Sequence, residues 1–123
     1  MIEDIASEAR KLTKDFEVYF QNSEINEIQL QKNKINFLNK VFDSGYGIRV
    51  LNGGIGFSSS SDKSKDAVIK TILNSLKAGK MAQKAEFYFP EQGKYEKVET
   101  VDKKIKEDGE KAVFEKAEEI IIA

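Results

Sequence analysis

The sequence predicts an α+β fold, a two-layer sandwich in which an antiparallel meander of about five strands carries two main helices on one face and a further helix follows at the C-terminus. Two observations predict it. Apolar side chains recur at helical spacing near the start, in the middle and at the end of the chain, whereas residues 16–58 alternate apolar and polar positions. The 123 residues are enough for a buried core.

The first elements follow from this periodicity. Residues 2–14 predict a helix because apolar side chains lie on one face, namely Ile2, Ile5, Ala6, Ala9 and Leu12. Residues 16–21 alternate and predict a strand. Residues 25–31 and 34–42 predict a hairpin that turns at the polar Lys32-Asn33-Lys34. This turn places four apolar side chains on one face: Ile28, Leu30, Ile35 and Phe37.

A second hairpin is indicated by Asn52-Gly53, because a type I′ turn needs positive φ at both central residues. A two-residue turn pairs Leu51 with Gly54 and Arg49 with Gly56. One face of the hairpin would then hold Ile48, Val50, Ile55 and Phe57. The other face would hold Gly47, Arg49, Leu51, Gly54, Gly56 and Ser58.

The second half of the chain is predicted to be mainly helical. Residues 65–82 have a broad apolar face, and Ser61 or Ser64 can cap the helix. The connector of residues 83–101 contains Phe87-Tyr88-Phe89-Pro90, aromatic side chains expected to act as core or cover. Residues 102–122 return to helix, with Asp108 as a candidate cap, and their apolar residues spread over more than one face. We therefore expect self-association through residues 110–123.

Composition excludes several classes of function. The chain has no Cys and no His, so it offers no disulfide, no thiol nucleophile, no imidazole base and no metal site of the usual zinc type; a carboxylate-only Mg²⁺ or Ca²⁺ site stays open. The 20 basic residues balance 21 acidic ones, which argues against a nucleic-acid partner. No apolar run is long enough for a membrane span, and the acidic start is unlike a signal peptide, so we expect no membrane partner and a cytoplasmic setting.

The candidate binding residues lie on the expected glycine-lined face: Arg49, Gly47, Gly54, Gly56 and Ser58. Arg49 either pairs with a carboxylate such as Glu27 or clamps a carboxylate or carbonyl of a ligand. The glycines match no phosphate-binding motif and favour a tight hairpin that another backbone can approach. The serines of residues 58–61 lack a base and favour a helix cap. No residue is predicted to be catalytic.

Residues 43–81 resemble the N-terminal domain of the TldD/PmbA family. The resemblance rests on Gly45-x-Gly47-Ile48-Arg49-Val50, on Asn52-Gly53, on Gly56-Phe57-Ser58-Ser59-Ser60-Ser61-Asp62 and on a helix ending Ala78-Gly79-Lys80-Met81. Weaker similarity extends it to roughly residues 2–90. It implies an α+β N-terminal domain at residues 1–90. Residues 91–123 would be a linker and helix that lead toward a C-terminal domain outside this chain.

The family is catalogued as modulators of DNA gyrase and is understood as zinc metallopeptidases active in proteolysis. Its zinc site, a His-Glu-x-x-x-His helix, belongs to the C-terminal domain, so this chain is expected to hold no cofactor and to be inactive alone. The chain would either be the N-terminal domain of such an enzyme or belong to a partner subunit of the kind that lacks the motif. The resemblance implies a peptide or unfolded protein as substrate and a homo- or heterodimer in which N-terminal domains line a cleft toward the active site. The alternative is a free-standing protein-interaction module without a catalytic domain. A coding region that continues past Ala123 into a His-Glu-x-x-x-His segment would favour the first hypothesis.

Overall fold

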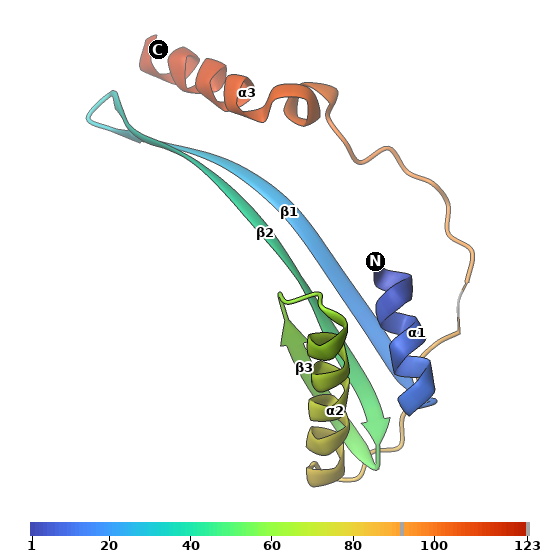
Figure 1. Ribbon diagram of the computed structural model, residues 1–123. Helices are drawn as coiled ribbons and strands as arrows, with labels where there is room; N and C mark the ends of the chain where they lie inside the picture. The colour runs from blue at the N-terminus through green and yellow to red at the C-terminus, as the bar shows by residue number, and fades with distance from the viewer. Residues whose placement is uncertain (92, 123) are drawn as a thin grey trace. The chain divides into compact units, whose positions relative to one another are not determined.

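The computed structural model describes residues 1–91 and 93–122 of the chain (Figure 1). The elements follow the order α1 (Ile2–Leu12), β1 (Phe16–Gln31), β2 (Lys34–Asn52), β3 (Gly54–Ser60), α2 (Lys65–Met81) and α3 (Lys103–Ile122). The chain divides into two compact units. Unit 1 comprises Met1–Asn22 and Ser44–Gln92, and unit 2 comprises Ser23–Asp43 and Gly93–Ala123.

The mixed α+β class is confirmed, but the sheet of the described chain has three strands in the order β1-β2-β3, so the expected five strands are wrong. The two segments predicted at residues 16–21 and 25–31 form the single strand β1, and β2 likewise joins two predicted strands. In the sequence, the polar residues between these segments suggest that the strands are interrupted. They contain no proline, however, and an exposed strand tolerates polar side chains, so the pairing continues through them.

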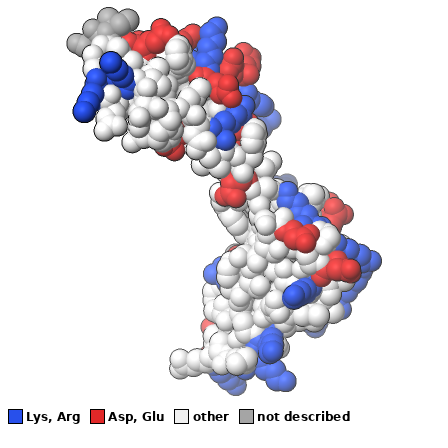
Figure 2. All heavy atoms as spheres, turned by 60° about the vertical axis from the view of Figure 1, so that its left-hand side comes forward, with Lys and Arg blue, Asp and Glu red and all other residues white. Residues whose placement is uncertain are grey.

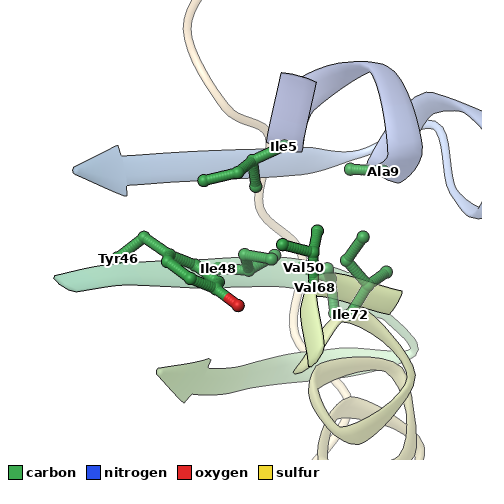
Figure 3. Close-up of a cluster of buried hydrophobic side chains, with 7 residues drawn as sticks. All are labelled: Ile5, Ala9, Tyr46, Ile48, Val50, Val68 and Ile72. Carbon is green, nitrogen blue, oxygen red and sulfur yellow. The ribbon is translucent and has the colours of Figure 1, made fainter. Parts of the chain in front are cut away.

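The core of unit 1 lies between the sheet and the two helices α1 and α2 (Figure 3). Alternate residues of β2 point toward the helices. The side chains of this cluster are Ile5 and Ala9 from α1, Tyr46, Ile48 and Val50 from β2, and Val68 and Ile72 from α2. Since both helices contact the same alternate residues of β2, the expected placement of two helices on one sheet face is correct.

The β2–β3 hairpin has a different register from the predicted one. Arg49 lies opposite Phe57 and Asn52 lies opposite Gly54, so only Gly53 remains at the turn, with φ of 81°. Asn52 does not have the positive φ that a type I′ turn requires. A shift of one residue moves every side chain of a strand to the other face. Gly54, Gly56 and Ser58 therefore share the face of Ile48 and Val50, which α2 covers.

The tip of the β1–β2 hairpin agrees with the prediction. Lys32 and Asn33 have φ of 52° and 61°, as a two-residue turn of type I′ requires. The side chains of Asn36 and Gln29 are joined across the hairpin by a bond of 3.5 Å. Their neighbours consequently occupy the opposite face together, as expected: Ile28, Leu30, Ile35 and Phe37.

Helix α3 is interrupted at Asp108, which has non-helical φ and ψ of −153° and 83°. The Asp108 carboxylate accepts a hydrogen bond from the backbone N–H of Lys111 at 3.1 Å, so the predicted cap is confirmed. Ala117 is buried within unit 2, whereas Phe114 and Ile120 are exposed. The spread of apolar residues over more than one side of α3 agrees with the sequence; self-association through them stays a prediction.

Candidate functional site

The sheet of unit 1 has a second face that α1 and α2 do not cover, and we call it the open face. Its residues alternate with those of the core, so β1 contributes Glu17 and Tyr19 while β2 contributes Gly47 and Arg49. Phe57 of β3, opposite Arg49, lies there with 60% of its surface exposed. The expectation that Ile55 and Phe57 share a face with Ile48 and Val50 is therefore wrong.

Arg49 is paired with a carboxylate on the neighbouring strand. Its Nη2 donates to Oε1 of Glu17 at 2.6 Å, and both side chains are 43% exposed. The partner is thus Glu17 and not the expected Glu27. At this exposure the ion pair contributes at most about 1 kcal/mol to stability. The Nε atom of Arg49 is buried and has no hydrogen-bond partner among the described residues.

The connector after α2 returns to the open face. The backbone N–H of Ala85 donates to the carbonyl of Gly53 at 3.0 Å, which ties the connector to the β2–β3 turn. Phe87 and Phe89 form an edge-to-face pair with ring centroids 5.2 Å apart. The two centroids lie 6.0 and 5.6 Å from Cζ of Arg49, within cation–π range. The aromatic side chains act as a cover for Arg49, one of the roles expected of them.

A shallow groove of about 260 Å³ lies beside Arg49, lined by Glu17, Tyr19, Gly47, Arg49 and Phe57. Its sides are aromatic, and a Cβ at Gly47 would come within 2.8 Å of the Phe57 ring, so bare backbone lies next to that ring. Such a surface can contact an extended chain through stacking on the rings and through hydrogen bonds from the guanidinium. None of its side chains is a nucleophile with a neighbouring base, so the chemistry that the groove offers is aromatic contact and hydrogen bonding.

The structure divides the five predicted site residues between two faces. Gly47 and Arg49 line the groove, whereas Gly54, Gly56 and Ser58 lie on the opposite face. A Cβ at Gly54 would come within 2.6 Å of the Gln83 carbonyl oxygen, and one at Gly56 would overlap the backbone of α2. The backbone that approaches these glycines closely therefore belongs to the chain's own helix and connector.

Sequence reasoning missed Glu17, Tyr19 and Phe57 as groove residues. The signal for the first two was present, because Phe16, Val18 and Phe20 alternate with them and pack against the core. Phe57 was assigned to the wrong face by the one-residue error in register. Its position could not be corrected without the contact between β3 and α2.

The serines of residues 58–61 do not supply the cap of α2, because residues 58–60 belong to β3 and the cap is Ser64, which follows the run. The Asp62 carboxylate accepts a hydrogen bond from the backbone N–H of Ser64 at 2.9 Å, and this bond lowers the pKa of Asp62. Ser64 in turn accepts from the N–H of Ala67 at 3.4 Å, which confirms it as the helix cap. Ser60 accepts from the N–H of Asp62 at 3.0 Å.

The described residues do not fit a zinc ion. Over residues 1–91 and 93–122, no three His, Cys, Asp or Glu side chains are grouped closely enough to hold a metal, and the sequence lacks the imidazole and thiolate ligands that zinc favours. In unit 2, the carboxylates of Glu24 and Glu110 pair with Lys40 at 3.1 and 3.4 Å. The hydrogen bond to Glu24 is the main cause of the raised pKa of Lys40.

The surface charge is mixed. Figure 2 shows Lys and Arg side chains interspersed with Asp and Glu on the face drawn. Within the part of the chain that the structure describes, no helix is both long enough and apolar enough to cross a membrane.

Comparisons with known proteins agree on the fold and on the family. The family described as PmbA/TldA metallopeptidase domain 1 matches residues 16–79, which are 64 of the 123 residues. The crystal structure of TldE from Thermococcus kodakarensis is similar, with a TM-score of 0.79 and 20% identity over 94% of this chain. The chain spans 27% of that TldE chain, about a quarter of its length. No curated protein matches. The chain thus belongs to the TldD/PmbA family and corresponds to its N-terminal domain.

Proposed function

We propose that this chain is the non-catalytic N-terminal domain of a TldD/PmbA-type metallopeptidase, in which its open face forms one wall of the cleft through which substrate reaches the catalytic site. The family description supplies the metallopeptidase activity. The observation that carries the proposed role is the groove beside Arg49. It combines exposed aromatic rings, bare backbone at Gly47 and a guanidinium with unused donors on a sheet face free of helices.

The chemistry of the groove favours a peptide in extended conformation. Glu17 already neutralises Arg49 at 2.6 Å, so a second carboxylate at this site would be repelled by Glu17. A peptide carbonyl carries no net charge and can accept from the remaining guanidinium N–H groups. The rings of Tyr19 and Phe57 can then contact an apolar side chain of the same peptide. A groove of this kind binds unfolded chain with little dependence on its acidic residues.

The proposed division of labour places hydrolysis outside this chain. Residues 1–90 would form the wall, and residues 91–123 would be a linker and helix that lead toward the catalytic domain. The zinc implied by the family description would be held by that domain, since the residues here do not fit it. The substrate would be a peptide or unfolded protein, and subunit contacts within a homo- or heterodimer of the family would be a second role.

The test is a titration of the isotopically labelled chain with a short unstructured peptide that contains Phe and Leu but no acidic residue, followed by amide NMR. We expect weak binding, with shifts concentrated at Tyr19, Gly47 and Phe57. Arg49→Ala should weaken binding at least fivefold. Arg10→Ala is the matched control, because Arg10 is the second arginine of the sequence and lies exposed on α1.

Equal loss of binding in both arginine variants would show nonspecific charge attraction and would contradict the proposal. The same peptide should be recovered intact after incubation with the pure chain and Zn²⁺. Cleavage that EDTA abolishes would contradict the assignment of this chain as non-catalytic. Binding unaffected by Arg49→Ala, with shifts confined to unit 2, would favour an interaction module of another kind.

A further inference from the structure

Strand β3 forms an edge of the sheet with an unusual composition. The order β1-β2-β3 gives β3 a single neighbour, to which all seven residues Gly54–Ser60 are paired. Among the described residues, the backbone hydrogen bonds outside helices and strands include none to residues 55–60; the nearest is from Ala85 to Gly53. The second edge of β3 consequently has backbone N–H and C=O groups that no other part of the described chain pairs.

Natural proteins usually protect such an edge with charges, proline or a covering segment. The opposite edge strand, β1, follows this rule, since it carries Glu17, Glu24 and Glu27. The sequence of β3, Gly-Ile-Gly-Phe-Ser-Ser-Ser, contains neither a charged residue nor a proline. In Figure 2, where the side of β3 is turned forward, unit 1 shows a broad area without charged side chains. The strand is therefore open to pairing with another extended segment.

We infer that β3 pairs antiparallel with β3 of a second copy of this chain, about a two-fold axis at Phe57. This contact deepens the subunit role in the proposed function and rests on that role. A strand without charge can face itself with no like-charge repulsion, which makes it self-complementary. Phe57 is the middle residue of β3, so an axis there pairs all seven residues and joins two three-stranded sheets into one.

The side chains of β3 are compatible with this pairing. Gly54 and Gly56 pack beneath α2, so the covered face of β3 is occupied by the chain's own helix and connector. Ile55 and Phe57 are 38% and 60% exposed on the open face. In the paired sheet Ile55 of one copy lies opposite Ser59 of the other, and the two Phe57 rings are neighbours. The contact thereby removes apolar surface from water.

The first test measures self-association by sedimentation equilibrium of the 123-residue chain up to roughly 1 mM, where an association worth only about 4 kcal/mol is still seen. We expect a dimer in the wild type and at least tenfold weaker association in Ser59→Lys and in Ile55→Lys, whereas association through residues 110–123 would be the same in both variants. Phe42→Lys adds the same charge at an apolar residue of unit 2 that is 70% exposed, and it should remain dimeric. Circular dichroism and thermal melting of each variant verify that it is folded.

The second test uses the absence of cysteine from the sequence. An axis at Phe57 places the two copies of that residue directly opposite each other, about 4.5–5.5 Å apart between Cα atoms, which suits a disulfide. Phe57→Cys should therefore cross-link to a covalent dimer under mild oxidation. Ile55→Cys alone should not, but the double variant Ile55→Cys/Ser59→Cys should, because these two residues face each other across the axis.

Three results would overturn the inference: a wild-type chain that is monomeric throughout, dimers that survive both lysine variants, or cross-linking that is equal in Phe57→Cys and Ile55→Cys. A monomer whose β3 amides shift on addition of the unstructured peptide would identify peptide as the occupant instead, which also excludes the paired copy. Ser59 does not line the groove, so Ser59→Lys reports on the pairing while Arg49→Ala reports on peptide binding. Failure of one proposal is thus distinguishable from failure of the other.

Discussion

On the face of the β2–β3 hairpin that meets α2, Gly54 and Gly56 lie against backbone atoms, whereas on the open face Gly47 lies against the ring of Phe57. The glycines are close in sequence and belong to the same hairpin. A backbone neighbour cannot move without moving a helix, while a ring at the surface can rotate. Glycine is therefore required by the packing at Gly54 and Gly56, whereas Gly47 can be replaced with a small loss of stability.

The difference extends to the polar groups of the two faces. Beneath α2, the hydroxyl of Ser75 is fully buried and lies 3.0 Å from the carbonyl oxygens of Ile48 and Thr71. On the open face, the polar contact is the half-exposed pair of Arg49 and Glu17. Loss of the buried Ser75 contact should therefore lower the free energy of unfolding more than loss of the half-exposed Arg49–Glu17 pair. Stability is concentrated on the covered face, so side chains of the open face can change with little loss of stability.

Gly56→Ala is expected to have the largest effect. The added Cβ would overlap the backbone of Ser75 and Gly79, so α2 must move away from β3 and lose contacts along its length. We expect the free energy of unfolding to fall by about 3 kcal/mol, the upper range of overpacking effects. Denaturant unfolding measures it. Gly47→Ala is the matched control, with an expected loss below about 1 kcal/mol because only the Phe57 ring must shift. Equal losses would contradict the distinction between the two faces.

Gly53→Val tests the turn that sets the register and thereby decides which residue belongs to which face. Gly53 has φ of 81°, and a Cβ added there would meet no atom within 4 Å, so the cost is backbone strain alone. We expect a loss of about 2 kcal/mol for the β-branched residue. Gly53→Asn should cost clearly less, because asparagine tolerates positive φ. Thermal melting of both variants measures the difference, and an unchanged melting temperature in Gly53→Val would mean that the turn is elsewhere.

Ser75→Ala removes the buried hydroxyl between α2 and β2. The carbonyl of Ile48 loses this contact while remaining buried, so we expect a loss of about 1–2 kcal/mol. Ser59→Ala, at an exposed position on β3, should change stability by less than about 0.5 kcal/mol. Denaturant unfolding of the two serine variants compares the faces again. A neutral Ser75→Ala would show that the hydroxyl contributes packing only.

The features that the sequence predicted correctly are local ones. The helices, the turn at Lys32 and Asn33, and the caps at Ser64 and Asp108 each depend on a few consecutive residues. The register at Gly53 was missed because a local rule favoured a two-residue turn. The register is decided by the packing of α2 against β3. In this packing Ser75 and Gly79 lie against Gly56, although they are distant from it in the sequence. The preference for a two-residue turn contributes less to stability than the burial of a helix against the sheet.

The candidate site shows the same limit. Arg49 and Gly47 were found because a charged residue and bare glycines are visible in the sequence itself. To predict Glu17 as the partner of Arg49, one must know how β1 lies beside β2, because the two residues belong to different strands. To predict that Phe87 and Phe89 cover Arg49, one must know the path of the connector. The described residues of this connector form neither helix nor strand. Which distant segments lie beside each other is known only from the assembled sheet, and a single sequence does not predict it.

Arg49→Ala is expected to have the smallest effect on stability and therefore tests the open face most directly. The variant loses an ion pair in which both side chains are 43% exposed, together with cation–π contacts to Phe87 and Phe89. Because solvent screens such a pair, we expect the free energy of unfolding to change by less than about 1 kcal/mol in denaturant unfolding. The aromatic connector should nonetheless become more mobile, which faster amide hydrogen exchange at residues 85–89 would show. Arg49→Lys keeps the charge and loses the planar fork, so it should restore stability without restoring the stacked rings. A loss above about 2 kcal/mol in Arg49→Ala would place Arg49 among the structural residues of the core and remove it from the binding groove.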